Sequence, residues 1–154
     1  MTMTAKLLAD PYLAALKEME RKSPNPSKAF PLLEKALNDD DPRAAYALGT
    51  WYLHGFYVEK NVRKGLKLIR AAAKRNVPSA LYDLAVSYEK GEGVKEDASR
   101  AAELYLKAAL HGDDQAVFEF GRCLYHGVGV PADRKLARVW LDRARDLGFF
   151  ESKR

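Results

Sequence analysis

The histidines are the residues best suited to chemistry, because an imidazole group can act as a base or bind a metal near neutral pH. Two of the three, His54 and His126, are 72 residues apart and stand before glycines at equivalent positions. If they occupy equivalent places in a stack of helices that pack about 10 Å apart, the two imidazoles are about 20 Å from each other. One metal ion cannot bridge that distance, so we interpret both histidines as polar residues in front of turns.

Two further groups resemble parts of catalytic sites. The Gly-x-Gly sequences at 91–93 and 127–129 look like fragments of a phosphate-binding loop, but neither continues into the Gly-Lys-Ser/Thr that such a loop needs. The carboxylates of Asp39–Asp41 precede Pro42, an arrangement typical of a helix start, where negative charge is favoured. These places are therefore predicted to be turns and caps. The sequence predicts no catalytic residue, no metal ligand and no cofactor, and hence no enzyme.

A period of 36 residues explains most of these positions. Four columns recur at that spacing: Ala44, Ala80 and Ala116; Gly55, Gly91 and Gly127; Val58, Val94 and Val130; and Ala72, Ala108 and Ala144. Repeats of this length are typically supersecondary units that cannot bury their apolar face alone, so neighbouring units stack on one another.

Each repeat contains two predicted helices. In the first complete repeat, Ala44, Leu48 and Tyr52 form the i, i+4, i+8 stripe of an amphipathic helix, and similar stripes follow in the next two repeats. A second helix follows the glycine turn, with a capping residue at its start and a residue that tolerates a left-handed backbone at its end. The caps are Asn61, Asp97 and Asp133, and the end residues are Asn76, Gly112 and Gly148.

The N-terminal part of the chain follows this pattern incompletely. Asn25 and Pro26 start a second-type helix in phase, but the amphipathic stretch that opens at Asp10 and Pro11 does not keep the phase. We expect one all-α domain, an α/α solenoid (superhelix) of helix–turn–helix repeats. Its expected parts are a degenerate repeat or cap at 1–40, repeats at 41–76, 77–112 and 113–148, and a tail at 149–154.

The segment 80–94, followed by Asp97 and Ala108, closely resembles the Sel-1-like repeat, a relative of the tetratricopeptide repeat. The segment 116–148 resembles it as well, and the resemblance covers about residues 25–148. It implies an α/α solenoid that binds another protein, without naming that protein.

One position of the first complete repeat departs from the pattern. Tyr57 stands where the other two repeats have Gly93 and Gly129. The turn there is either wider, or it holds Tyr57 at a backbone angle that is unfavourable for a residue with a side chain.

Composition bears on the class and the compartment. The 154 residues are 47% hydrophobic, which suits one folded unit of ordinary size. No stretch is long enough for a membrane span, and the first residues lack the apolar core of a secretory signal. We therefore expect a cytoplasmic protein, or a chain from which a signal was removed. Cys123, the single cysteine, is expected to be a buried small hydrophobe. This disfavours the secreted branch of Sel-1-like proteins, in which a pair of cysteines staples each repeat.

The candidate partner-binding surface is the face of each first helix opposite its buried stripe, because this side lines the concave groove of tetratricopeptide-like stacks. An aromatic residue recurs there, flanked by cations and histidines that would orient a partner and favour an acidic one. Two interpretations stay open: the rings contact the partner, or they pack between repeats. The candidate residues are Arg43, Tyr46, Thr50, His54, Tyr82, Val86, Lys90, Phe118, Arg122, Tyr125 and His126.

A second surface is basic. From Lys60 to Arg75 there are seven basic residues and no acidic one, and the segment 134–145 adds five basic residues against Asp142. These second helices are expected on the convex face. They suggest an alternative function, the binding of a polyanion such as nucleic acid or an acidic surface, although the absence of a recognisable nucleic-acid module disfavours nucleic acid.

Phe149 and Phe150 follow the last predicted helix, where no further repeat covers them. They either fold back over the exposed end or make an intermolecular contact. A homo-oligomer formed through these two rings is therefore a hypothesis.

Overall fold

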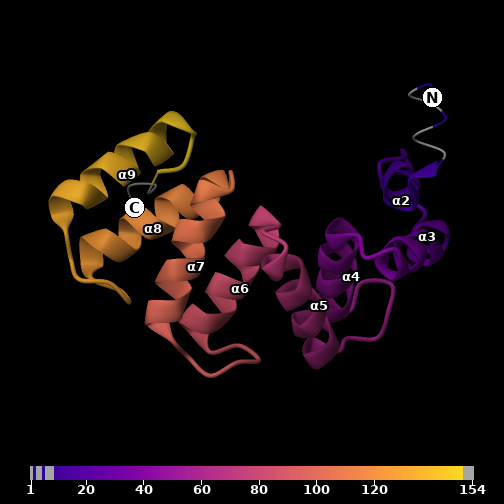
Figure 1. Ribbon diagram of the computed structural model, residues 1–154, viewed down its shortest axis with the longest axis horizontal. Helices are drawn as coiled ribbons and strands as arrows, with labels where there is room; N and C mark the ends of the chain where they lie inside the picture. The colour runs from indigo at the N-terminus through magenta and orange to yellow at the C-terminus, as the bar shows by residue number, and fades with distance from the viewer. Residues whose placement is uncertain (1, 3–4, 6–8, 151–154) are drawn as a thin grey trace. The chain divides into compact units, whose positions relative to one another are not determined.

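The computed structural model describes residue 2, residue 5 and residues 9–150 of the chain (Figure 1). All the regular secondary structure of these described residues is helical, which confirms the prediction of an all-α fold. In chain order the helices are α2 (Pro11–Met19), α3 (Pro26–Asn38), α4 (Pro42–His54), α5 (Val62–Lys74), α6 (Pro78–Lys90), α7 (Ala98–Leu110), α8 (Asp114–His126) and α9 (Arg134–Asp146).

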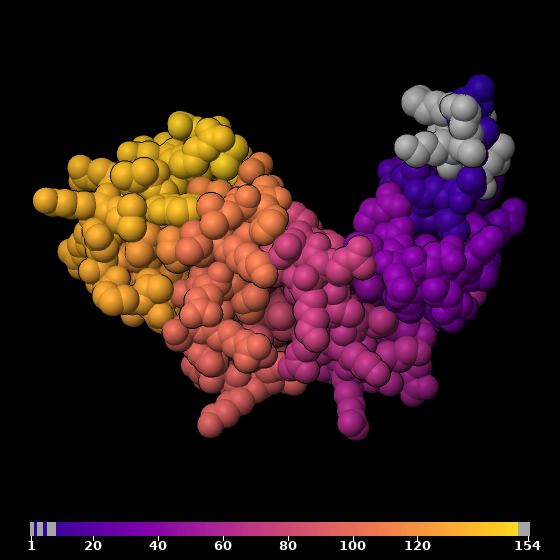
Figure 2. All heavy atoms as spheres, in the orientation of Figure 1, coloured from indigo at the N-terminus to yellow at the C-terminus, as the bar shows by residue number. Residues whose placement is uncertain are grey.

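The helices gather into two compact units, residues 1–75 and residues 76–154, which we call the N-terminal and C-terminal units. In the N-terminal unit α2 packs on α3, α3 on α4 and α4 on α5; in the C-terminal unit α6 packs on α7, α7 on α8 and α8 on α9. Contacts between chain neighbours are typical of repeat proteins. In the C-terminal unit, side chains close the space between the ribbons of α8 and α9 (Figure 2).

The helix starts are built by the capping residues that the sequence predicted. The side chains of Asn25, Asn61, Asp97 and Asp133 accept a hydrogen bond from a backbone N–H in the first turn of α3, α5, α7 and α9. Such a bond satisfies one of the amides that a helix start leaves without a partner. Within the Asp39–Asp41 triplet, Asp41 caps α4 in the same way.

The ends of the second helices also follow the prediction. Asn76, Gly112 and Gly148 have positive φ angles of 60°, 99° and 90°. Asp40, at the equivalent position after α3, has a φ of 57°. Its role was not predicted, because the three aspartates together were interpreted as the start of the next helix. Aspartate is one of the few residues with a side chain that visit this region at modest cost.

The core is made of small residues at the periodic positions. Ala44, Ala72, Ala80, Ala108, Ala116 and Ala144 are all fully buried. Glycines bring two helices still closer: a methyl group on Gly65 of α5 would lie 2.8 Å from the carbonyl oxygen of Gly49 in α4. The backbones of the two helices of this repeat therefore approach each other directly.

The turn after α4 has the same geometry as its glycine counterparts. Tyr57 has a φ of 60°, against 69° for Gly93 and 70° for Gly129. Of the two predicted alternatives, the unfavourable backbone angle is therefore confirmed. The ring of Tyr57 packs against Phe30, with centroids 5.7 Å apart, and against Trp51, at 6.0 Å.

Cys123 is fully buried within α8. Burial raises the pKa of its thiol to about 11, so the reactive thiolate is scarce at neutral pH. The prediction of a buried small hydrophobe is confirmed. In the part of the chain that the structure describes, no helix has the length and apolar character needed to span a membrane.

Candidate functional site

An open pocket of about 500 Å³ lies in the C-terminal unit, between the first helices of two successive repeats. α6 and α8 form its walls and α7 contributes one residue. The lining residues are Tyr82, Val86, Glu89 and Lys90 from α6, Tyr105 from α7, and Glu119 and Arg122 from α8.

Helical spacing brings these side chains to one surface. Tyr82, Val86, Glu89 and Lys90 follow the i, i+4, i+7, i+8 pattern, so they lie along one face of α6. Their helix buries the opposite stripe, which includes Ala80, Leu84 and Ala85. The residues of the pocket wall are consequently those that the amphipathic pattern leaves outside the core.

A network of charged hydrogen bonds joins the two walls. The Nη2 of Arg122 donates to Oε1 of Glu89 at 2.6 Å, and its Nε donates to Oε2 of Glu119 at 2.7 Å. The hydroxyl of Tyr105 donates to the other oxygen of Glu89 at 2.7 Å. One guanidinium thus bridges a carboxylate of α6 and a carboxylate of α8, which fixes the width of the pocket on this side.

The pKa values reflect this pairing. Burial alone would raise the pKa of Glu89, but hydrogen bonds from Tyr105 and Arg122 outweigh it, so this pKa lies below its ordinary value. Burial lowers the pKa of Arg122, but the two carboxylates raise it more. Burial, aided by nearby carboxylates, raises the pKa of Tyr82 to about 12 and that of Tyr105 further. At neutral pH Glu89 and Arg122 are charged and both phenols are neutral.

This arrangement is suited to binding. The pocket presents the half-buried Tyr82 and Val86 beside the exposed Lys90, while Arg122 already has two carboxylate partners. Both phenols hold their protons tightly, which makes them poor bases at neutral pH. Among the described residues, no group of three or more His, Cys, Asp or Glu side chains could hold a metal ion.

The predicted residues of the C-terminal unit are divided between this pocket and the surface around it. Tyr82, Val86, Lys90 and Arg122 line the pocket. Phe118 is half-buried and is not a lining residue. Tyr125 and His126 are exposed at the end of α8 and contact each other, with ring centroids 4.9 Å apart, and the guanidinium of Arg134 lies 5.0 Å from the Tyr125 ring.

The other predicted residues belong to the N-terminal unit. Arg43 is paired with Asp41 and Asp10 and lies over the ring of Tyr12. Thr50 donates its hydroxyl to the carbonyl of Ala47 within α4. The remaining two are Tyr46, which is half-buried, and His54, which is exposed at the end of α4.

Glu89, Glu119 and Tyr105 were not predicted as site residues. Glu89 lies on the same helix face as Tyr82 and Val86, so its position alone was a usable signal. Tyr105 is 36 residues after Ile69, a core position. A hydroxyl at such a position needs a hydrogen-bond partner, and that requirement could have led to Glu89.

The aromatic residues at the end of the chain are partly described. The backbone N–H of Phe149 donates to the carbonyl of Ala144 and closes α9, and Phe149 is half-buried. Phe150 is 67% exposed. The tail predicted at 149–154 otherwise lies outside the described residues, and self-association through these rings stays a prediction.

Comparison with known proteins identifies the repeats. The family model described as Sel1 repeat matches residues 18–41, 42–77, 78–113 and 115–149. The search of curated proteins found no match. Among solved structures, a Sel1 repeat protein from Oxalobacter formigenes is 32% identical, with a TM-score of 0.72 over 76% of this chain and 88% of that chain.

Two further solved structures share the architecture. The c5321 protein of uropathogenic Escherichia coli, described as a protective antigen with an SLR fold, is 24% identical with a TM-score of 0.83, over 95% of this chain and 32% of that chain. Helicobacter pylori cysteine rich protein B is 26% identical with a TM-score of 0.59, over 76% of this chain and 89% of that chain. The matched repeats, the helical architecture and these similarities confirm the resemblance and the predicted solenoid class: the chain belongs to the Sel1 repeat family.

Proposed function

We propose that this protein is a non-enzymatic adaptor that binds a segment of a partner protein in the pocket between α6 and α8. Sel1 repeat proteins are generally protein–protein interaction scaffolds, and their fold is typically non-catalytic. The observation that carries the proposal is the pocket itself, where an aromatic ring, an aliphatic side chain and a lysine converge between two successive repeats.

The chemistry of the pocket suggests what it accepts. Tyr82 and Val86 offer a partly exposed apolar surface, and aromatic residues commonly provide much of the binding energy at protein interfaces. Arg122 is already paired with Glu89 and Glu119, so Lys90 is the lining cation outside this network. In our proposal an apolar side chain of the partner packs against Tyr82 and Val86, and an acidic residue beside it faces Lys90.

The single cysteine fits a reducing compartment. Cys123 is buried and free, and cytosolic proteins keep their thiols reduced. This supports the cytoplasmic location expected from the sequence. In our proposal the partner is therefore a cytoplasmic protein as well.

A capture experiment tests the pocket. The wild-type chain, the Val86→Glu/Lys90→Glu variant and the Val139→Glu/Arg138→Glu control are incubated with nuclease-treated lysate of the source organism, and bound proteins are identified by mass spectrometry. The control likewise replaces a valine and a basic residue by glutamate on α9, where both residues are exposed. Circular dichroism checks that all three chains keep their helices.

We expect one or more proteins to bind the wild type and the control but not the pocket variant. A buried partner side chain would meet the new carboxylate at position 86, and an acidic partner residue would be repelled at position 90. Equal capture by all three folded chains would exclude the pocket as the binding surface.

A further inference from the structure

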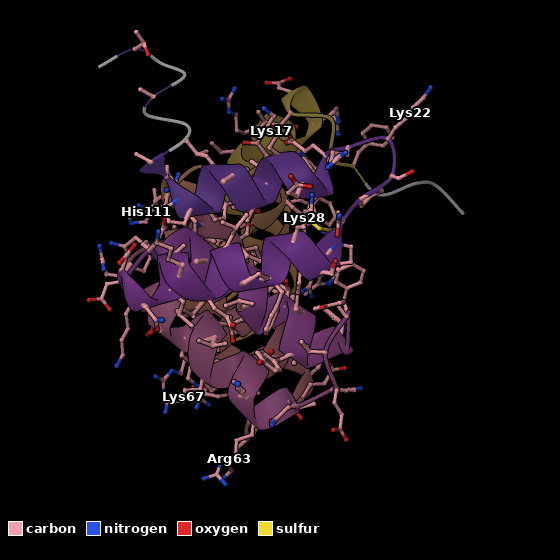
Figure 3. All side chains as sticks on the ribbon, turned by 90° about the vertical axis from the view of Figure 1, so that its right-hand side faces the viewer. Lys17, Lys22, Lys28, Arg63, Lys67 and His111 are labelled. Carbon is pink, nitrogen blue, oxygen red and sulfur yellow. The ribbon has the colours of Figure 1, made fainter. Side chains whose placement is uncertain are left out.

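The solvent face of α5 carries a continuous row of cations. Arg63, Lys67, Arg70 and Lys74 follow the i, i+4, i+7, i+11 pattern of one helix face, and all four are exposed. At a rise of 1.5 Å per residue they span about 16 Å along the helix axis. The opposite face of α5 is buried in the N-terminal unit. Figure 3 shows Arg63 and Lys67 pointing away from the ribbon. We call these four residues the α5 stripe.

The charges of the α5 stripe are not balanced within the described structure. α5 contains no acidic residue, and no ion pair, hydrogen bond or ring contact of the described residues involves the side chains of the stripe. Neighbouring cations behave differently. The ammonium of Lys64 donates to the hydroxyl of Tyr52 and lies over its ring, and Arg75 donates to the carbonyl of Asp40.

The fold does not require cations at these places. The four equivalent positions are Ser27, Pro31, Glu34 and Asn38 in α3; Ser99, Glu103, Leu106 and Leu110 in α7; and Lys135, Val139, Asp142 and Asp146 in α9. These three helices form without a basic row, so the α5 stripe has no evident role in building the repeat.

The stripe also accounts for most of the charge difference between the units. Residues 1–75 contain 14 lysines and arginines against 8 acidic residues, whereas residues 76–154 contain 12 against 13. The positive charge of the protein is thus a property of the N-terminal unit. Within that unit, α5 supplies the longest run of cations uninterrupted by an acidic residue.

We propose that the α5 stripe binds an acidic helix of a partner protein. A helix with carboxylates at i, i+4, i+7 and i+11 presents them along a straight line with the same spacing as the four cations, so each cation can meet one carboxylate. A nucleic-acid duplex fits less well, because its phosphate backbone curves away from a straight row. α5 has no aromatic side chain on which bases of a single strand could stack.

Binding of synthetic peptides to the full chain tests this proposal. Two Ala- and Gln-based peptides of about 15 residues, a length at which such helices begin to form, each carry four glutamates. One has them at i, i+4, i+7 and i+11, and the other has the same composition with the glutamates spread around the helix. Fluorescence anisotropy measures both affinities, with a mixed-sequence DNA duplex as the third probe.

We expect the striped peptide to bind at least several-fold more tightly than the scrambled one, with an affinity that falls as salt rises. The Arg63→Gln/Lys67→Gln/Arg70→Gln/Lys74→Gln variant should weaken this binding about tenfold, since it removes four exposed ion pairs that each contribute only modestly to affinity. The Lys107→Gln/Lys135→Gln/Arg138→Gln/Arg143→Gln variant removes the same charge from exposed positions of the C-terminal unit and should retain the affinity.

Three outcomes would overturn the proposal. Equal affinity for the two peptides would exclude recognition of the helical spacing. An equal loss of affinity for the striped peptide in the two quadruple variants would show that binding depends on net charge and not on the α5 stripe. Tighter binding of the DNA duplex than of the striped peptide would assign the stripe to nucleic acid instead. None of these outcomes depends on the pocket between α6 and α8.

Discussion

Both units of this protein contain an arginine bridge and a turn with a left-handed residue, but these features differ between the units. Each has an arginine that joins two carboxylates contributed by successive repeats: Arg43 with Asp10 and Asp41 in the N-terminal unit, and Arg122 with Glu89 and Glu119 in the C-terminal unit. The side chain of Arg43 is 43% exposed and that of Arg122 is 25% exposed. The same bridge therefore lies near water in one unit and within a pocket wall in the other.

The turns differ in a second way. Gly129 lies against the backbone of Ala98, so that a methyl group there would overlap the Ala98 carbonyl. Tyr57 adopts a similar φ but holds its ring on Phe30 and Trp51. The same left-handed backbone angle is thus adopted by a glycine where another backbone comes close, and by a tyrosine where aromatic neighbours pack against its ring. The repeat fixes the backbone, and the neighbours fix the residue.

The largest effect is expected from Gly129→Ala. The methyl group needs both a left-handed backbone and a displacement of α7, which together should cost about 3 kcal/mol of the free energy of unfolding. Gly112→Ala is the matched control, because Gly112 also has a positive φ but no atom within 4 Å of the added methyl. It should cost only about 1 kcal/mol. Urea unfolding followed by circular dichroism measures both, and equal losses would show that the Ala98 contact is unimportant.

An intermediate effect is expected from the two arginine bridges. Arg122→Gln leaves Glu89 and Glu119 without their cation in a half-buried wall, which should cost about 2 kcal/mol, less than for a fully buried pair. Arg43→Gln, in the more exposed bridge, should cost less than about 1 kcal/mol. Urea unfolding measures both, and hydrogen exchange should show the Arg122→Gln loss in α6 and α8.

The effect of Arg122→Gln should also depend on pH. Because Arg122 and Tyr105 hold the pKa of Glu89 below its ordinary value of 4.5, this contribution is complete above that pH and is lost as the pH falls through the lowered pKa. The difference in stability between wild type and variant should therefore shrink in acid. A larger loss of stability for Arg43→Gln than for Arg122→Gln would contradict the prediction that the less exposed bridge contributes more.

An effect smaller than that of Arg122→Gln is expected at Tyr57. Tyr57→Ala removes the ring contacts and keeps the left-handed angle, whereas Tyr57→Gly removes the same contacts and relieves the angle. The alanine variant should be less stable than the glycine variant by about 1 kcal/mol. Thermal unfolding of the two variants side by side measures this difference. Equal stability would indicate that the backbone angle carries no cost at this turn.

Much of the fold could be predicted because its signals are local. A capping side chain reaches an amide two or three residues away, and an apolar stripe repeats within one helix. Asn61 and Gly148 were accordingly assigned from their residue types and their phase alone. Asp40 was missed because a run of three aspartates has a local explanation as a helix start, and only the backbone angle distinguishes the end of α3 from the beginning of α4.

The candidate site was predicted only in part, because it depends on which side chains meet. The phase of the repeat placed Tyr82, Val86, Lys90 and Arg122 on one surface, and the structure brings them to one pocket. The phase of the repeat did not indicate that Arg122 would pair with two carboxylates, nor that a core tyrosine would donate a hydrogen bond to Glu89. The two contacts to Glu89 join residues 33 and 16 positions apart, and they depend on side-chain rotamers that a period does not specify.

The sequence by itself determined the helices and their caps, because these arise from interactions within one or two turns of chain. It also determined the 36-residue period and the membership of a stacked-repeat class, because the recurrence of residue types can be read directly along the chain. Only the tertiary structure decided which cations are balanced and which remain available. Arg43 and Arg122 were candidates for attracting a partner and are already paired, whereas the α5 stripe forms no ion pair among the described residues. Whether a charge is balanced depends on what another helix places within about 4 Å of it, and a linear pattern does not contain that distance.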